Sequence, residues 1–152
     1  MIDYAGSASR SVYDHVIVPT DGSEAAGEAA EHGIRQAAAH GAQLVFLAVV
    51  ELSGTAAPEA RDDDDAVSER REARREEVTS LVEEAESAGV EAEGVVETGV
   101  PSRVITEQAV TRGADLVVMS TNARSGVGRF LYGSITEQVI RDGETPVLAI
   151  QR

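Results

Sequence analysis

Five short apolar runs, separated by segments of helical character, constrain the fold of this chain more than any other feature. The runs are rich in Val, Ile and Leu, and they cover 15–19, 44–50, 94–96 with its flanks, 116–119 and 147–150. Nearly continuous apolarity is typical of strands that are buried on both faces of a sheet. Strands that alternate with helices predict right-handed βαβ crossovers. We therefore expect an α/β fold, a three-layer doubly wound sandwich around a five-stranded parallel sheet.

Two helices are predicted in the first half of the chain. Ser23 is the expected N-cap of an Ala-rich helix over 23–40, and Gly41 is the expected stop. The second helix covers about 66–88 and carries one apolar stripe, made of Val67, Val78, Leu81, Val82 and Ala85.

Two more helices are predicted in the second half. Pro101 suits the first turn of the third helix, which ends before Gly113. Ser134 and Glu137 have the spacing of a capping box, so we expect them to open the fourth helix. Each helix follows one apolar run and precedes the next, as the parallel sheet requires.

The length of 152 residues predicts one domain. We place it at 13–152, after a flexible N-terminal arm of small and polar residues over 1–12. The longest apolar run is far shorter than the roughly 20 residues that span a bilayer, and no signal-peptide core is visible. The sequence has no Cys, which fits a reducing compartment. We therefore expect a cytoplasmic protein that does not bind membranes.

The chain is strongly acidic and contains no Lys, with a net charge of −14. The absence of Lys excludes P-loop, Schiff-base and kinase-type lysine chemistry, as well as a phosphoacceptor receiver site. No basic stripe is present, so nucleic-acid binding is not expected. More than half of the excess charge lies in 59–91, which we interpret as a solvent-facing adaptation of the halophilic type, away from the strand ends. Thermal unfolding from low to multimolar KCl tests this interpretation, and salt-independent stability would contradict it.

Open parallel sheets bind ligands at the carboxyl ends of their strands, where the strand order reverses. Three features gather there in this sequence. Asp21 follows the first strand, and a loop of small residues with Arg124 and Arg129 follows the fourth. These two arginines are the only positive charges expected near the strand ends. Gly133 and Ser134 open the last helix. Small residues and guanidinium groups suit an anion, as do the free N–H groups of a helix N-terminus.

Each of these features also has a purely structural interpretation. Asp21 and Ser23 can form an Asx-turn and a helix cap without binding a ligand. Arg124 and Arg129 can face solvent, and Ser134 can serve the capping box alone. The residues by themselves leave both interpretations open.

The chain resembles the universal stress protein family over almost its whole length, from Asp14 to Gln151. The resemblance rests on five segments of the sequence: 17–23, 115–119, 124–126, 133–137 and 145–150. It implies an adenine-nucleotide alpha-hydrolase-like fold. It also implies a stress-response protein that binds ATP or another adenine nucleotide, with or without Mg²⁺, and acts through protein partners that the sequence does not identify.

Nucleotide-binding members of that family carry the motif G-x2-G-x9-G followed by Ser or Thr. In this sequence Ser120 and Ala123 occupy the first two glycine positions, and Gly133 with Ser134 matches the end. The nucleotide-binding residues that the resemblance implies are Pro19, Thr20, Asp21, Val49, Met119, Ser120, Ala123, Arg124, Gly126, Arg129, Gly133, Ser134 and Ile135. A family member without nucleotide binding, acting as a dimeric interaction or protective module, is the alternative.

Catalytic and metal-binding roles are not assigned to any residue. The three His residues lack metal-ligand spacing. Efficient catalysis is not expected, and the resemblance implies at most slow ATP hydrolysis or phosphate transfer to Ser134. The last strand is short and follows Pro146, so it is expected at a sheet edge. We predict a homodimer through this edge, formed by Val147, Leu148, Ala149 and Ile150.

Overall fold

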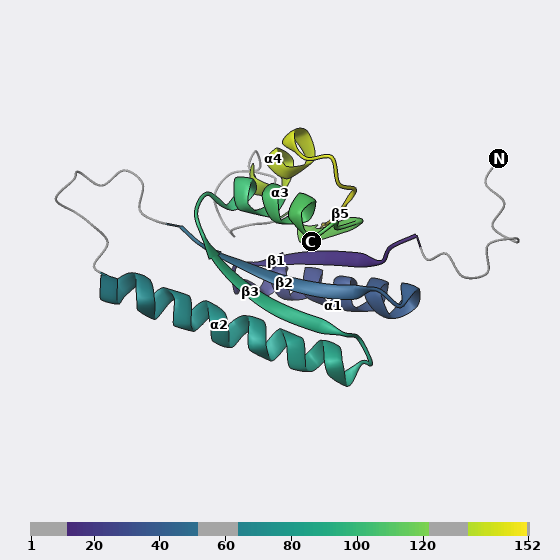
Figure 1. Cartoon of the computed structure of the whole chain (residues 1–152), viewed down its shortest axis with the longest axis horizontal. Coiled ribbons are helices and arrows are strands. Elements are labelled where there is room, and N and C mark those ends of the chain that lie inside the picture. The colour runs from purple at the N-terminus through teal and green to yellow at the C-terminus, as the bar shows by residue number, and fades with distance from the viewer. Residues whose placement is uncertain (1–11, 52–63, 122–133, 152) are drawn as a thin grey trace, which may run out of the picture.

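The computed structural model describes residues 12–51, 64–121 and 134–151 (Figure 1). Strands and helices alternate in these ranges. The strands are β1 (His15–Thr20), β2 (Gln43–Val50), β3 (Ala92–Thr98), β4 (Leu116–Ser120) and β5 (Val147–Ile150). The helices are α1 (Glu24–His40), α2 (Asp64–Ser87), α3 (Pro101–Thr111) and α4 (Ser134–Asp142). The N-terminal arm predicted at 1–12 lies outside the described residues except for its last position.

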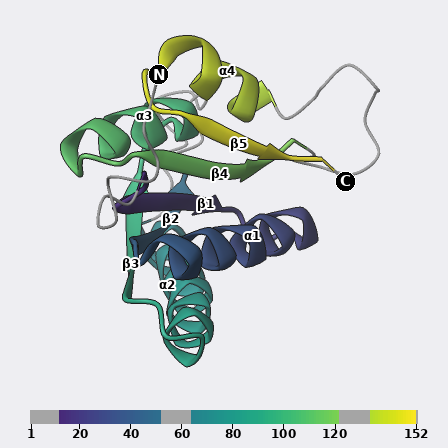
Figure 2. The same ribbon diagram turned by 90° about the vertical axis from the view of Figure 1, so that its right-hand side faces the viewer.

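The five strands form one parallel sheet in the order β3-β2-β1-β4-β5. Helices α1 and α2 cover one face of the sheet, and α3 and α4 cover the other (Figures 1 and 2). The expected three-layer α/β fold around a five-stranded parallel sheet is confirmed. The strand order reverses between β1 and β4, because the chain runs outward from β1 to β3 and then crosses back.

The central strand β1 supplies both apolar cores, one on each face of the sheet. Val16 and Val18 pack with Phe46 in the core beneath α1 and α2, whereas Ile17 packs with Val117 in the core beneath α3 and α4. None of these five side chains is more than 1% exposed. Complete burial of such a side chain contributes about 1.5–3 kcal/mol relative to exposure. This two-sided burial explains why the central runs are apolar without alternation.

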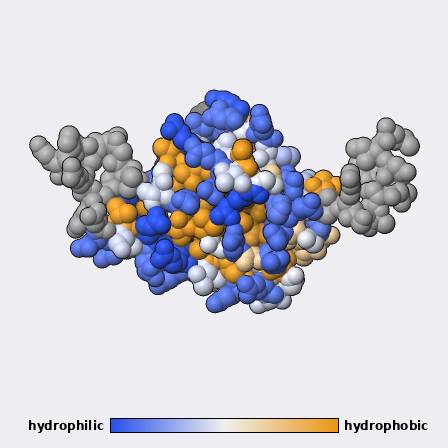
Figure 3. Space-filling view, in the orientation of Figure 1, coloured by the Kyte–Doolittle hydropathy of each residue, from blue (hydrophilic) through white to orange (hydrophobic). Residues whose placement is uncertain are grey.

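The expectation of burial on both faces is wrong for the two edge strands. In β3 (Ala92–Thr98) and β5 (Val147–Ile150) every side chain is at least partly exposed. Each of these strands has a neighbour on one side only within the described sheet. In Figure 3, apolar side chains reach the surface between the more hydrophilic surfaces of α2 and α4.

Helix α1 is bounded as predicted. The Ser23 hydroxyl accepts a hydrogen bond from the Ala26 N–H at 3.1 Å, and Gly41 ends the helix with a φ of 64°. The inner face of α1 is lined by small residues, which let the helix approach β1 closely. A Cβ built on Gly33 would lie 2.3 Å from Cγ2 of Val18, so this position admits no side chain without movement.

The start of α4 agrees with the predicted one, and that of α2 lies slightly earlier. Helix α4 begins at Ser134, where the sequence predicts it, and the capping box at this end stays a prediction because the preceding residue lies outside the described ranges. Glu137 accepts a hydrogen bond from Arg141 at 2.7 Å, one turn further along the helix. Helix α2 begins at Asp64, two residues earlier than expected, and its stripe is confirmed, with Val78 and Ala85 buried.

Asp115 joins the beginnings of β1 and β4. Its Oδ2 accepts hydrogen bonds from the backbone N–H groups of Asp14, at 2.8 Å, and His15, at 3.0 Å. The Asp115 N–H in turn donates to the His15 carbonyl at 2.8 Å. Residues about 100 positions apart in the sequence therefore fix the centre of the sheet.

Within the described ranges, each helix is too short or too polar to cross a membrane.

Candidate functional site

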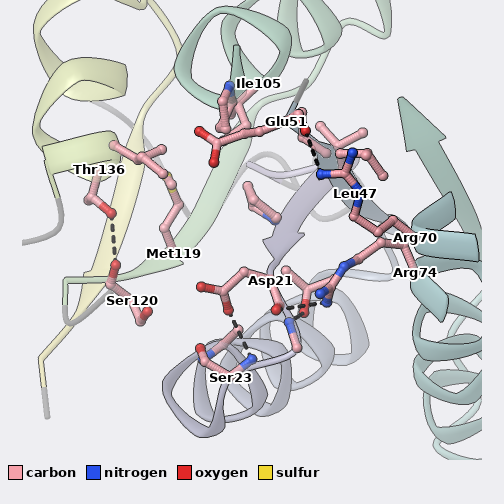
Figure 4. Close-up of a pocket in the computed structure, with 18 residues that line it drawn as sticks. Asp21, Ser23, Leu47, Glu51, Arg70, Arg74, Ile105, Met119, Ser120 and Thr136 are labelled. Atoms are coloured by element: carbon pink, nitrogen blue, oxygen red, sulfur yellow. Dashed lines mark hydrogen bonds between the residues drawn. The ribbon is translucent and has the colours of Figure 1, made fainter. Parts of the chain in front are cut away.

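A pocket of about 730 Å³ lies at the carboxyl ends of β1, β2 and β4, where the strand order reverses (Figure 4). This is the place that the parallel topology predicts for a ligand. Its volume falls in the range of about 300–1,000 Å³ typical of small-molecule sites. The lining residues come from seven elements and their ends: Pro19, Thr20, Asp21, Gly22, Ser23, Ala26, Leu47, Val49, Val50, Glu51, Arg70, Arg74, Pro101, Ile105, Met119, Ser120, Ile135 and Thr136.

The turn after β1 holds Asp21 at the rim of the pocket. Asp21 Oδ1 accepts a hydrogen bond from the Ser23 N–H at 2.9 Å, and the Gly22 N–H donates to Thr20 Oγ1 at 3.2 Å. The predicted Asx-turn and helix cap are therefore confirmed. Asp21 Oδ2 accepts no hydrogen bond from the described part of the chain. In Figure 4 the carboxylate faces the pocket, so the structural role leaves one oxygen for a ligand.

One wall of the pocket is apolar. Leu47 and Val49 come from β2, Ile105 from α3, Met119 from β4 and Ile135 from α4. Leu47, Ile105 and Met119 are at most 6% exposed, so their positions are fixed by the surrounding core. The flat faces of a nucleobase can be buried against such a wall, while its polar edge stays free for hydrogen bonds.

The end of β4 and the start of α4 close the side of the pocket opposite α2 (Figure 4). The Thr136 hydroxyl is buried and donates to the Ser120 carbonyl at 2.7 Å, which joins the helix to the strand end. None of the described residues other than Gly has a positive φ. Ser120 therefore occupies a motif glycine position without backbone strain.

Two arginines of α2 also line the pocket, and sequence reasoning missed them. Arg70 Nη1 donates to the Glu51 carbonyl at 3.1 Å, and Arg74 Nη1 donates to the Asp21 carbonyl at 2.8 Å. The acidic segment 59–91 was expected to face solvent away from the strand ends, so this expectation is wrong for part of α2. The available signal was position: Arg74 precedes Val78 by four residues and thus shares its face of the helix.

The pocket brings together seven of the predicted binding residues, from three strand ends and α4: Pro19, Thr20, Asp21, Val49, Met119, Ser120 and Ile135. Ser134 begins α4 beside them but does not line the pocket. The other predicted positions lie outside the described residues: Ala123, Arg124, Gly126, Arg129 and Gly133. Among the described residues, no group of three or more His, Asp or Glu side chains could hold a metal ion. Nucleotide contact by the seven residues stays a prediction.

Comparison with known proteins agrees with the fold. The model of the universal stress protein family matches residues 12–151. Universal stress protein MJ0531 of Methanocaldococcus jannaschii is 34% identical over 143 residues, which cover 93% of this chain and 84% of that protein.

Two solved structures share the fold. The structure of protein MJ0577 of the same organism has a TM-score of 0.83 at 24% identity and covers 93% of this chain and 97% of that one. A universal stress protein in complex with cAMP has a TM-score of 0.66 at 27% identity and covers 91% of this chain and 96% of that one. With the family model matched along nearly its entire length, the chain belongs to the universal stress protein family.

Proposed function

We propose that this chain is a cytoplasmic stress-response protein that binds an adenine nucleotide in the pocket and acts through protein partners. The observation that carries the proposal is the Asp21 carboxylate, held at a strand end with Oδ2 turned toward the pocket. A carboxylate in this position suits the hydroxyl groups of a ribose. The complex of a universal stress protein with cAMP supports the same class of ligand.

Different parts of the pocket suit different parts of the nucleotide. Base and sugar fit between the apolar wall and Asp21, while the start of α4 is the natural place for a phosphate because its N–H groups and dipole favour an anion. The predicted loop with Arg124 and Arg129 joins β4 to α4 in sequence, and its guanidinium groups suit the same phosphates. We propose binding rather than turnover as the function, with slow hydrolysis or transfer to Ser134 as the upper limit.

Isothermal titration calorimetry with nucleotide-free protein tests the proposal. ATP, AMP and cAMP should each bind with a dissociation constant below 1 mM, which corresponds to roughly −4 kcal/mol or better. Titration of ATP with Mg²⁺ and with EDTA decides whether the metal contributes. If no adenine nucleotide binds at millimolar concentration, the proposal is wrong, and the alternative of a non-nucleotide-binding dimeric module stands in its place. Mass spectrometry of any small molecule released by denaturation identifies the bound species.

We also propose that the chain forms a homodimer through β5. This strand is an edge of the described sheet, and its side chains Val147, Leu148 and Ile150 are only partly buried. An unpaired edge offers N–H and C=O groups to a second copy related by a twofold axis. Light scattering at micromolar concentration in high salt should give twice the mass of the chain, and a monomer would contradict the proposal.

A further inference from the structure

Three arginines of α2 tie that helix to the carboxyl ends of three neighbouring strands. Arg71 Nη1 donates to Thr98 Oγ1 at 2.5 Å at the end of β3, and Arg70 Nη1 donates to the Glu51 carbonyl after β2. Arg74 Nη1 donates to the Asp21 carbonyl after β1 at 2.8 Å. We call these three residues the α2 arginine clamp. Two of its members, Arg70 and Arg74, line the pocket, whereas Arg71 does not.

Arg74 is the member that touches the turn carrying Asp21. Its Nη1 also lies 2.8 Å from Glu77 Oε1 and 2.6 Å from Oε2, and both side chains are only about one-third exposed, at 31% and 34%. The turn fits closely against this pair. Gly22 has a φ of 79°, and a Cβ there would lie 2.7 Å from Arg74 Nη1 and 2.6 Å from Glu77 Oε1.

Asp21 is therefore fixed at two points. The Ser23 N–H holds side-chain Oδ1, and Arg74 holds the main-chain carbonyl of the same residue. Fixing both the peptide plane and the side chain determines where Oδ2 points. Glu77 offsets the charge of Arg74, so the contribution of Arg74 here is geometric rather than a general attraction for phosphate.

We propose that Arg74 is a positioning residue for ligand recognition: through the Asp21 carbonyl it orients the Asp21 carboxylate toward the ribose hydroxyls of the nucleotide. This inference rests on the proposed function. By this proposal α2 contributes to the distinction between a ribose and a sugar that lacks the 2′ and 3′ hydroxyls, although α2 belongs neither to the β1 turn nor to the loop after β4. Preorganisation of this kind increases affinity because less conformational entropy is lost on binding.

The test compares the dissociation constants of AMP and 2′,3′-dideoxy-AMP in several variants. A hydrogen bond to a charged group is worth enough to make the wild-type ratio roughly tenfold or more in favour of AMP. Arg74→Gln should bring the ratio close to one, as Asp21→Asn should, and the double variant should show no further loss. Arg74→Lys keeps a donor for the Asp21 carbonyl and should recover part of the ratio.

Arg71→Gln is the matched control. It removes another member of the clamp from the same helix, so α2 loses a hydrogen bond to the end of β3. The hydrogen bond from Arg74 to the Asp21 carbonyl is left in place. Its ratio should equal that of the wild type. Three results would overturn the proposal: an unchanged ratio in Arg74→Gln, equal weakening of both ligands, or the same loss of ratio in Arg71→Gln.

A second measurement needs no ligand. In the free protein, NMR backbone order parameters at Gly22 and Ser23 should fall in Arg74→Gln from about 0.85 toward 0.6, but stay unchanged in Arg71→Gln. If wild-type protein binds no nucleotide, the proposed function fails, while the order parameters still decide whether Arg74 fixes Asp21. An unchanged order parameter at Ser23 in Arg74→Gln would refute the positioning role even if nucleotides bind.

Discussion

Exchange of Asp21 for Asn is expected to weaken AMP binding by about ten- to hundredfold. The reason is that a hydrogen bond from a hydroxyl to a charged group contributes roughly 1.5–3 kcal/mol, and each 1.4 kcal/mol is a factor of ten in affinity. Asn retains an acceptor for the Ser23 N–H, which Asp21 Oδ1 binds at 2.9 Å, so the turn and the cap of α1 should persist. Calorimetric titration with AMP measures the loss, and thermal unfolding without ligand checks that the fold is intact.

Glu31→Gln is the control for charge. It removes the same unit of negative charge from the exposed surface of α1, outside the pocket. Its dissociation constant for AMP should stay within about twofold of the wild-type value, since exposed charges more than a Debye length of about 8 Å away are screened. An Asp21→Asn variant that binds AMP as tightly as the wild type would show that the carboxylate only caps the turn.

Two Gly-to-Ala exchanges in α1 are expected to change stability in opposite directions. Gly33→Ala places a Cβ 2.3 Å from Cγ2 of the fully buried Val18, so either the helix or β1 must move. Overpacking of this kind costs about 1–3 kcal/mol, more than the roughly 1 kcal/mol that Ala gains over Gly in a helix. Gly27→Ala meets no atom within 4 Å and should stabilise the protein by about 0.5–1 kcal/mol.

Urea unfolding of both variants measures the difference through the midpoint, provided that the slope is unchanged. Because the two positions share one helix, the helix propensity of Ala is the same in both and only the contact with β1 differs. Equal stabilisation by both exchanges would mean that α1 and β1 do not pack as closely as the structure shows.

The strands of this fold could be predicted because burial on both faces requires a nearly continuous run of apolar residues in the sequence. Ile17 and Val18 are adjacent and belong to opposite cores, so both must be apolar. The boundaries of α1 were equally accessible, since Ser23 and Gly41 act locally through a hydroxyl and a left-handed backbone. The candidate site followed from topology, because Asp21 follows β1 and Met119 lies near the end of β4, and the parallel arrangement brings these two strand ends together.

The contribution of α2 to the pocket could not be predicted in the same way. A charged residue usually faces solvent, and the sequence around Arg70 and Arg74 is dense in charges of both signs. The four-residue spacing of Arg74 and Val78 indicates which face of α2 Arg74 lies on. It does not indicate the acceptors, the Glu51 and Asp21 carbonyls, because these lie at the ends of strands far away in sequence.

The central place of β1 also has a consequence for synthesis on the ribosome. Strand β1 can pair with β2 soon after both are synthesised, but its other edge pairs with β4, which follows about 95 residues later. At translation rates of about 5–20 residues per second this interval lasts roughly 5–20 s. During that time the nascent chain carries an unpaired edge at Val16 and Ile17, which β4 covers only when Leu116 and Val117 arrive. The strand order that creates the pocket therefore leaves one edge of β1 without a partner strand until β4 has been synthesised.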